Sequence, residues 1–130
     1  MATVLIIEDN PHNMKLASFL LENAGHMTLQ ASDAQVGIAL ARAHRPEIIL
    51  MDIQLPGMDG LAATQLIKAD ADLRHSKVFA LTAFAMKGDE DKIRAAGCDG
   101  YIAKPFNYRT FLETIAAALP TSAAADPQGE

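Results

Sequence analysis

An uninterrupted apolar run that ends in a carboxylate most constrains how this chain can fold. Ile48, Ile49, Leu50 and Met51 follow one another without polar alternation, and Asp52 comes directly after them. A strand that is apolar on both faces is typical of a parallel sheet covered by helices on both sides. An acidic residue has no packing reason to follow such a run. We therefore expect the strand to hold the Asp52 carboxylate at the rim of a functional opening.

Five apolar segments alternate along the chain with five segments whose hydrophobic residues repeat at helical spacing. The former predict strands at 3–7, 27–30, 47–51, 78–81 and 99–103. The latter predict helices at 11–24, 33–44, 62–69, 87–95 and 108–119. Parallel strands joined by right-handed helical connections require helices on both faces of one sheet. We therefore expect an α/β fold with five strands and five helices in three layers.

Polar residues and glycines mark the expected helix ends. Asn10 and Asn107 are expected N-caps, and Gly25 is an expected stop for the first helix. Ser32 and Gln35 have the spacing of a capping box, which predicts the start of the second helix. Four apolar residues at helical spacing predict the inward face of that helix: Val36, Ala39, Leu40 and Ala43.

Length and charge exclude several classes of protein. The chain has 130 residues, which is enough for one domain with its own core. A formal net charge of −5 gives neither the footprint of a nucleic-acid-binding protein nor a polybasic membrane patch. No apolar run could span a bilayer and Cys98 is the single cysteine, so we expect a cytoplasmic protein. We expect a folded domain at 1–119 and a flexible C-terminal tail at 120–130, which is rich in Ala, Ser, Pro and Gly.

Four of the five predicted strands end in polar or charged residues. Glu8 and Asp9 follow the first strand, Asp52 the third, Thr82 the fourth and Lys104 the fifth. If the strands take the order 2-1-3-4-5, one of the known orders of such sheets, the first and third strands flank the crevice at the carboxyl ends. Asp9 and Asp52 then become neighbours.

Such a cluster of carboxylates requires a cation. Two carboxylates about 4 Å apart repel by roughly 4 kcal/mol at an effective dielectric constant of about 20. Lys104 is one available cation and Mg²⁺, which prefers oxygen ligands, is another; no Cys or His is placed to favour zinc. Together with the Thr82 hydroxyl, this set suits phosphoryl transfer in which Asp52 attacks and becomes an aspartyl phosphate. The chain has no Gly-rich phosphate loop, so the donor must carry its own activated group, such as a phosphohistidine on a partner protein.

These motifs resemble the receiver domain of bacterial two-component response regulators. The resemblance covers about 3–119 and rests on four segments in the family's order: Glu8-Asp9-Asn10, residues 51–60, Leu81-Thr82-Ala83 and Lys104-Pro105. Residues 10–16 and 83–90, with Gly97-Cys98, are similar more narrowly to the single-domain cell-cycle receivers. The resemblance implies a flavodoxin-like or CheY-like (βα)5 sandwich with a parallel sheet in the order 2-1-3-4-5.

The resemblance also implies a magnesium site. Asp52 would be the phosphoacceptor and a metal ligand, and Asp9 would bind Mg²⁺ directly. Glu8 stands where many family members have aspartate, so its longer side chain would act through water. Gln54 would supply its backbone carbonyl to the metal.

The remaining implied roles concern the phosphoryl group and the response to it. Thr82 and Lys104 would bind the phosphoryl oxygens, and the Lys104–Pro105 peptide bond would be cis. Tyr101, three residues before the lysine, has the position of the family's switch aromatic. Phosphorylation would draw Thr82 toward the new charge and let Tyr101 turn inward, which changes the surface of the fourth helix, fifth strand and fifth helix.

We therefore expect a single-domain response regulator in a phosphorelay. Its phosphoryl group would come from a histidine kinase or a histidine phosphotransfer protein, and a downstream protein would bind the surface of the fourth helix, fifth strand and fifth helix. We expect a monomer or weak dimer with no enzymatic activity beyond Mg²⁺-dependent self-phosphorylation and autodephosphorylation, and no contact with nucleic acid or membrane.

Several other functions are compatible with these residues. The domain could be a phosphate sink, an intermediate relay of a hybrid kinase system, or a scaffold that binds partners without phosphorylation. A phosphatase with an aspartyl-phosphate intermediate usually has a second aspartate two residues after the nucleophile, where this chain has Gln54. A flavodoxin-like cofactor carrier is disfavoured because Glu8 and Asp9 would repel the flavin phosphate.

Overall fold

Five parallel strands form a single sheet in the order β2-β1-β3-β4-β5, as expected. The structure, a computed structural model, describes residues 2–55, 57–83 and 87–119. The strands are β1 (Thr3–Ile7), β2 (Met27–Ala31), β3 (Ile48–Asp52), β4 (Lys77–Thr82) and β5 (Gly100–Ala103). The helices are α1 (Pro11–Asn23), α2 (Ala34–His44), α3 (Gly60–Ala69), α4 (Lys87–Ala95) and α5 (Tyr108–Ala118). The expected α/β fold is therefore confirmed, whereas the predicted tail at 120–130 lies outside the described residues.

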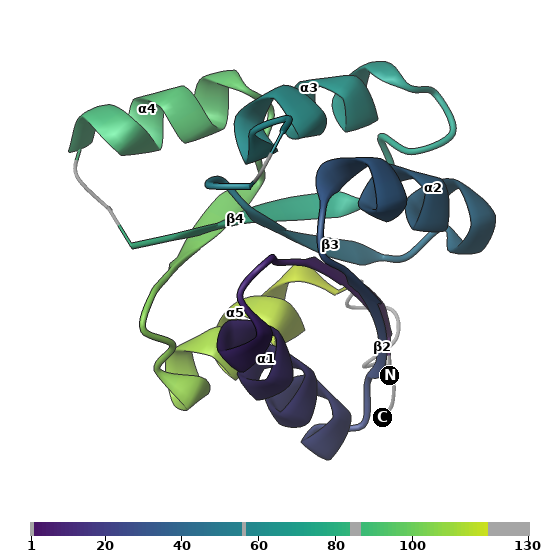
Figure 1. Cartoon of the computed structure of the whole chain (residues 1–130). Coiled ribbons are helices and arrows are strands. Elements are labelled where there is room, and N and C mark those ends of the chain that lie inside the picture. Colours follow the sequence, from purple (N-terminus) through teal and green to yellow (C-terminus); the bar gives the residue numbers. More distant parts are fainter. Residues whose placement is uncertain (1, 56, 84–86, 120–130) are drawn as a thin grey trace, which may run out of the picture.

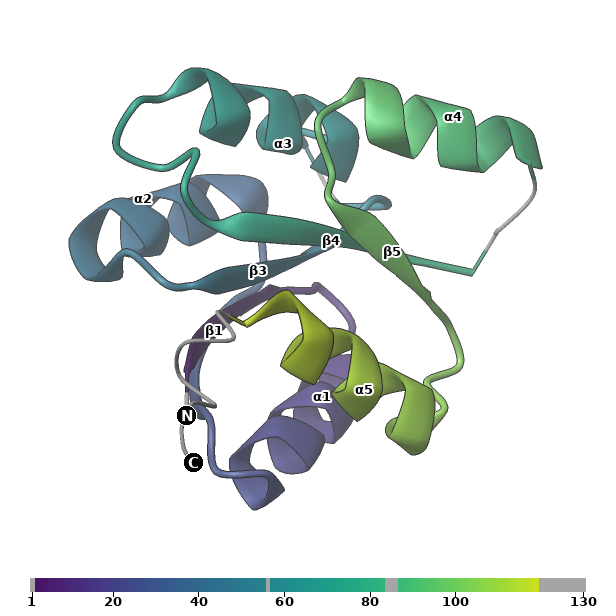
Figure 2. The same ribbon diagram turned by 180° about the vertical axis from the view of Figure 1, so that it is seen from behind.

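The helices cover both faces of the sheet. Figures 1 and 2 show α1 and α5 on one face and α2, α3 and α4 on the other. Because neighbouring residues of a strand point to opposite faces, β3 supplies Leu50 to the α1–α5 layer and Ile49 and Met51 to the α2–α4 layer. All five residues of β3 are buried. This burial on both sides explains the uninterrupted apolar run, and it makes the position of Asp52 at the end of β3 rigid.

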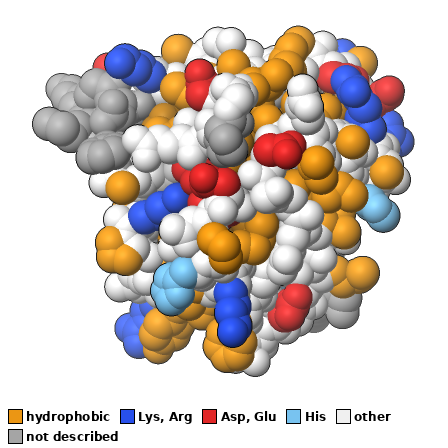
Figure 3. All heavy atoms as spheres, viewed as in Figure 1, with side chains coloured by type: hydrophobic (Ala, Val, Ile, Leu, Met, Phe, Trp, Pro, Cys, Tyr) orange, Lys and Arg blue, Asp and Glu red, His pale blue; other side chains and the backbone are white. Residues whose placement is uncertain are grey.

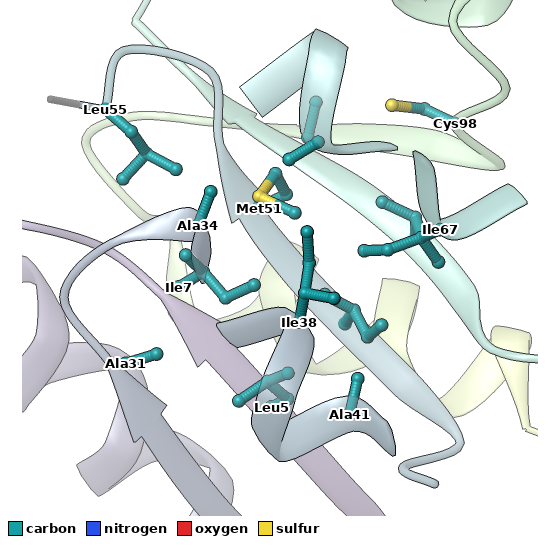
Figure 4. Packing of buried hydrophobic residues seen from close by; sticks show 14 of the residues in the cluster. Leu5, Ile7, Ala31, Ala34, Ile38, Ala41, Met51, Leu55, Ile67 and Cys98 are labelled. Carbon is teal, nitrogen blue, oxygen red and sulfur yellow. The ribbon is translucent and has the colours of Figure 1, made fainter. Parts of the chain in front are cut away.

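The α2–α4 layer packs closely because one helix has a glycine at its contact with the sheet. Figure 4 shows Ile7, Ile38, Met51 and Ile67 pointing into this layer. A Cβ atom at Gly37 of α2 would overlap Cδ1 of Ile7 and lie 2.6 Å from its Cγ1. The glycine therefore lets α2 approach β1 directly.

The predicted inward face of α2 was wrong. Val36 is 47% exposed and the side chains of Ala39 and Ala43 are also exposed, although Leu40 is half-buried. The buried residues of α2 are instead Ala34, Gly37, Ile38 and Ala41. Hydrophobic periodicity does not register a glycine, and here the close approach at Gly37 decides which side of the helix faces the sheet.

Two helix starts also differ from the prediction. The N-cap of α2 is Asp33 and not Ser32, because the Asp33 carboxylate accepts a hydrogen bond from the Val36 N–H at 2.9 Å. Helix α3 begins at Gly60, two residues before the expected start, and Asp59 is its N-cap. The expected caps of α1 and α5, Asn10 and Asn107, are confirmed. None of the helices in the described part of the chain is long and apolar enough to cross a membrane.

Helix α5 depends on one aromatic anchor. Phe111 is fully buried in the α1–α5 layer, whereas Tyr108 on the same helix is 60% exposed. We expect Phe111→Ala to lower the free energy of unfolding by about 3–5 kcal/mol, because it leaves a cavity that the sheet cannot fill. Tyr108→Ala should change it by less than about 0.5 kcal/mol. Urea unfolding followed by circular dichroism measures both variants, and equal losses would contradict this packing.

Candidate functional site

Three carboxylates meet at the carboxyl ends of the two central strands. Strands β1 and β3 pair in parallel with Ile7 opposite Met51, so the residues that follow them are neighbours. One oxygen from each of Glu8, Asp9 and Asp52 lies within 4.8 Å of the others. Glu8 is 2% exposed and Asp52 is 4% exposed, whereas Asp9 is exposed. In Figure 3 acidic side chains gather near the middle of the face with a basic side chain beside them.

The Asp52 side chain is oriented from two sides. Its Oδ1 accepts a hydrogen bond from the backbone N–H of Gln54 at 3.0 Å, and its Oδ2 lies 3.2 Å from Nζ of Lys104. The first turn of α3 packs against the same strand end. A Cβ atom at Gly60 would overlap the carbonyl oxygen of Asp52 and lie 2.7 Å from Cα of Ile53, so this position requires glycine.

Lys104 connects the carboxylates to the far edge of the sheet. Its Nζ lies 2.8 Å from Oε1 of Glu8 and 3.2 Å from Oδ2 of Asp52. Its backbone N–H donates to the carbonyl of Thr82 at 2.8 Å, and the following bond to Pro105 is cis, as the resemblance implied. Burial alone would lower the pKa of Lys104, but the hydrogen bond to Glu8 and the charge of Asp52 raise it above its ordinary value. The lysine therefore stays charged.

The Glu8 carboxylate is buried in surroundings that disfavour its charged form. Burial raises its pKa from 4.5 to about 7, and the neighbouring Asp52 adds to this effect. Lys104 and the Asn10 N–H, which donates to Oε2 of Glu8 at 3.1 Å, act in the opposite direction. Three carboxyl groups thus share the single ammonium of Lys104, so acidic groups are in excess in this cluster. A donor set made only of oxygen atoms fits a hard divalent cation such as Mg²⁺.

The remaining predicted site residues lie around this cluster. The side chain of Gln54 is exposed, and its backbone N–H faces Asp52. Thr82 is 1% exposed at the end of β4. Tyr101 is half-buried against the α2–α4 layer, opposite Ala80 in the β4–β5 register. Thr82 is two residues beyond Ala80 on the same face, so Thr82 and Tyr101 are diagonal neighbours on adjacent strands.

Two residues of the site were not identified from the sequence. Asn10 was expected only as a helix cap, yet its N–H also supports the Glu8 carboxylate. Gly60 was left outside the helix predicted at 62–69, yet it provides the space in which α3 contacts the backbone of Asp52. Asp59, seven residues after Asp52, was the available signal, because aspartate is a preferred N-cap residue.

The sequence matches the response regulator receiver domain family over residues 4–116. DivK of Brucella anthropi, a polar-differentiation response regulator, is 50% identical over 117 residues, which are 90% of this chain and 95% of that protein. The chain therefore belongs to the receiver domain family of the two-component response regulators, the signalling proteins that act with histidine kinases or phosphotransfer proteins. Within that family it is a DivK-like receiver, as the resemblance of residues 10–16 and 83–90 predicted.

Solved structures agree with this assignment. The chemotaxis response regulator CheY4 of Vibrio cholerae superposes with a TM-score of 0.87 at 27% identity and covers 92% of this chain and 99% of its own. The receiver domain of the sensor histidine kinase PA1611 from Pseudomonas aeruginosa superposes with a TM-score of 0.82 at 33% identity and covers 89% of this chain and 95% of its own. That structure holds a magnesium ion in its active-site cleft.

The raised pKa of Glu8 predicts how stability depends on pH in the metal-free protein. The folded-state pKa of about 7 lies above the ordinary value of 4.5, so the folded protein binds more protons than the unfolded chain in this interval. The stabilisation is full below pH 4.5 and is lost as the pH rises through about 7. Relative to Glu8→Gln, the wild-type protein should lose at most about 3 kcal/mol between about pH 5 and pH 8.

Urea unfolding in the presence of a chelator measures this difference. Glu113→Gln is the matched control, because Glu113 is an exposed carboxylate of α5. The control should follow the wild-type curve at every pH. A constant offset between wild type and Glu8→Gln across the range would contradict the assignment of the titration to Glu8.

Proposed function

We propose that Asp52 accepts a phosphoryl group from a phosphohistidine of a histidine kinase or a histidine phosphotransfer protein, and that the domain signals by changing its contacts with other proteins. The observation that carries the proposal is the burial of the Asp52 carboxylate and the contacts of its two oxygen atoms. The carboxylate is buried at the end of a rigid strand, with one oxygen on the Gln54 N–H and the other beside Lys104. The match to the receiver domain family over residues 4–116 supports the same function.

In the proposed transfer, an oxygen of Asp52 forms a bond to phosphorus while the phosphorus–nitrogen bond of the donor breaks. The bond's electron pair leaves with the imidazole. The ammonium of Lys104, now shared between Glu8 and Asp52, turns to an oxygen of the transferred group, and the Thr82 hydroxyl donates to another. The positions of Lys104 and Thr82 on neighbouring strands support this division of roles.

Glu8, Asp9, Asp52 and the carbonyl of Gln54 would hold the Mg²⁺ ion, with Glu8 acting through water. Three carboxylate oxygens within 4.8 Å of one another support this ligand set, and PA1611 provides a family precedent. Bound Mg²⁺ would neutralise charge on the transferred group and replace the charge that Lys104 withdraws from Glu8. The excess of acidic groups around Lys104 supports this role.

We propose that Thr82 and Tyr101 report the phosphorylation to the α4-β5-α5 face. A phosphoryl group adds roughly −1.5 to −2 charge beside Thr82 and draws its hydroxyl away from the diagonal neighbour Tyr101. Tyr101 is half-buried, so its ring can turn inward once that space opens. The two positions would be populated according to how far the phosphoryl group stabilises one of them. A downstream protein would distinguish the two resulting surfaces.

Replacing the phosphoacceptor should abolish phosphorylation. We expect Asp52→Asn to eliminate Mg²⁺-dependent labelling by acetyl phosphate or by a phosphorylated kinase, because an amide oxygen is too weak a nucleophile. Asp72→Asn, at an exposed carboxylate that pairs with Arg45 on the surface, should be labelled like the wild type. Mass spectrometry of the intact protein measures the added phosphoryl group. Labelling of Asp52→Asn at the wild-type rate would disprove the proposal.

Removing the switch aromatic should separate phosphorylation from signalling. We expect Tyr101→Ala to be phosphorylated at the wild-type rate, because Tyr101 belongs to the apolar layer and not to the carboxylate cluster. Its binding to downstream proteins should no longer respond to phosphorylation. A pull-down with and without acetyl phosphate, followed by mass spectrometry, compares the variant with the wild type. An unchanged response would remove Tyr101 from the switch, and binding that ignores phosphorylation in both proteins would identify a scaffold.

A further inference from the structure

We propose that the outer edge of β2 is a self-association surface, on which β2 of a second copy of this chain pairs in antiparallel orientation. The inference is independent of the proposed phosphorylation. Within the described residues, β2 ends the sheet on one side and β5 ends it on the other. Figure 1 shows β2 at the border of the molecule, beside α1.

The sequence of β2 lacks the usual protection of an edge strand. Exposed edges normally carry charges, proline or a bulge, which prevent pairing with other chains. The strand Met27–Ala31 contains neither a charged residue nor proline. Met27 at the start of β2 is 61% exposed. No charge or proline within β2 therefore opposes its pairing with a further strand.

The backbone of β2 offers matching donors and acceptors to an identical strand. Met27 donates its N–H to Ala2 and the Ala31 carbonyl accepts from Glu8, so the odd-numbered residues of β2 bond to β1. The N–H and carbonyl groups of Thr28 and Gln30 consequently face outward. A twofold axis through Leu29 sets Thr28 opposite Gln30 of the second copy. Each such pair exchanges two hydrogen bonds, so the full outward edge is satisfied.

The flanking helices leave room for this pairing. Helices α1 and α2 each contact both β1 and β2. The axis of each helix therefore lies over the gap between these two strands, about half a strand spacing inward from β2. Two copies joined through β2 would therefore bring α1 to α1 and α2 to α2 at about 10 Å, which is two strand spacings. That separation is close to the ordinary distance between packed helices, about 8–10 Å.

Charge and shape on α1 are complementary under the same twofold axis. The Gln30 side chain donates a hydrogen bond to Ser18, and the Thr28 hydroxyl donates one to Glu22. Along the strand direction, Leu29 therefore lies level with the part of α1 between Ser18 and Glu22. The axis then brings Glu22 opposite Ser18 of the second copy, within reach of Lys15 one helical turn further along. Opposite charges thus face each other twice.

An apolar surface lies between these charges. Phe19 is 61% exposed and lines a groove of about 500 Å³ between α1 and β2, together with Lys15, Glu22 and Gln30. Basic, acidic and hydrophobic side chains lie together over α1 in the lower part of Figure 3. Near the axis the two Phe19 rings would cover each other, and on the other face Met27 would lie opposite Ala31 of the second copy. The antiparallel arrangement points the two carboxylate clusters to opposite ends, so both stay accessible.

Sedimentation velocity of the full chain over a concentration series tests the proposal. The wild type should form a reversible dimer as concentration rises. Met27→Lys should raise the dissociation constant about tenfold or more, because it places two charges in the interface. Lys15→Glu should raise it about tenfold by setting like charges opposite each other, and adding Glu22→Lys should restore association. Leu66→Lys, at a residue of α3 that is 52% exposed, is the matched control and should dimerise like the wild type.

Amide hydrogen exchange locates the contact directly. The amides of Thr28 and Gln30 should become protected in the concentrated sample and lose this protection in Met27→Lys, while the Met27 amide, bonded to Ala2, stays protected throughout. Circular dichroism verifies that each variant is folded. A wild type that remains monomeric up to about 1 mM, where even weak specific binding is populated, would overturn the proposal. A dimer that Leu66→Lys disrupts but Met27→Lys does not would overturn it as well.

Discussion

The ion pair of Lys104 with two buried carboxylates is the interaction on which the site depends. Glu8 and Asp52 would repel each other by several kcal/mol at this separation in a medium of intermediate dielectric constant. The lysine ammonium, 2.8 Å from one and 3.2 Å from the other, compensates part of that repulsion. The lysine follows the edge strand β5 and reaches the centre of the sheet because its own N–H is bonded to the end of β4. Four strands, β1, β3, β4 and β5, therefore have to be paired before the cluster is stable.

The rest of the fold makes the arrangement rigid and leaves its charge unbalanced. The full burial of β3 and the contact of Gly60 with the Asp52 carbonyl fix where the carboxylate stands. Burial raises the pKa of Glu8 to about 7, and the neighbouring Asp52 adds to this effect although Lys104 opposes it. Such unfavourable electrostatics is typical of a functional site, where stability is given up for chemistry. Under the proposed function, a bound cation and a phosphoryl group that competes for Lys104 would each change this balance of charge.

Much of this architecture was predictable because its signals are local. Apolar runs and helical periodicity identified all ten elements, and Asn10 and Asn107 were recognised as caps because a side chain bonds its own helix start. The errors arose where packing decided. Ser32 and Gln35 had the spacing of a capping box, yet the adjacent Asp33 caps α2. The buried side of α2 follows from the close approach of Gly37 to Ile7, which no periodicity of side chains records.

By itself the sequence determined the class of fold, its family and the residue types of the site, because strand ends are recognisable from where apolar runs stop. Only the tertiary structure decided how those residues share their charge. Lys104 lies between Glu8 and Asp52, Asn10 and Gln54 support the two carboxylates through backbone amides, and Gly60 admits α3 against the backbone of Asp52. These contacts join residues that are far apart in the chain or involve backbone groups that every residue carries. The contacts of Lys104 with both carboxylates exist only once parallel pairing has brought the carboxyl ends of the strands together.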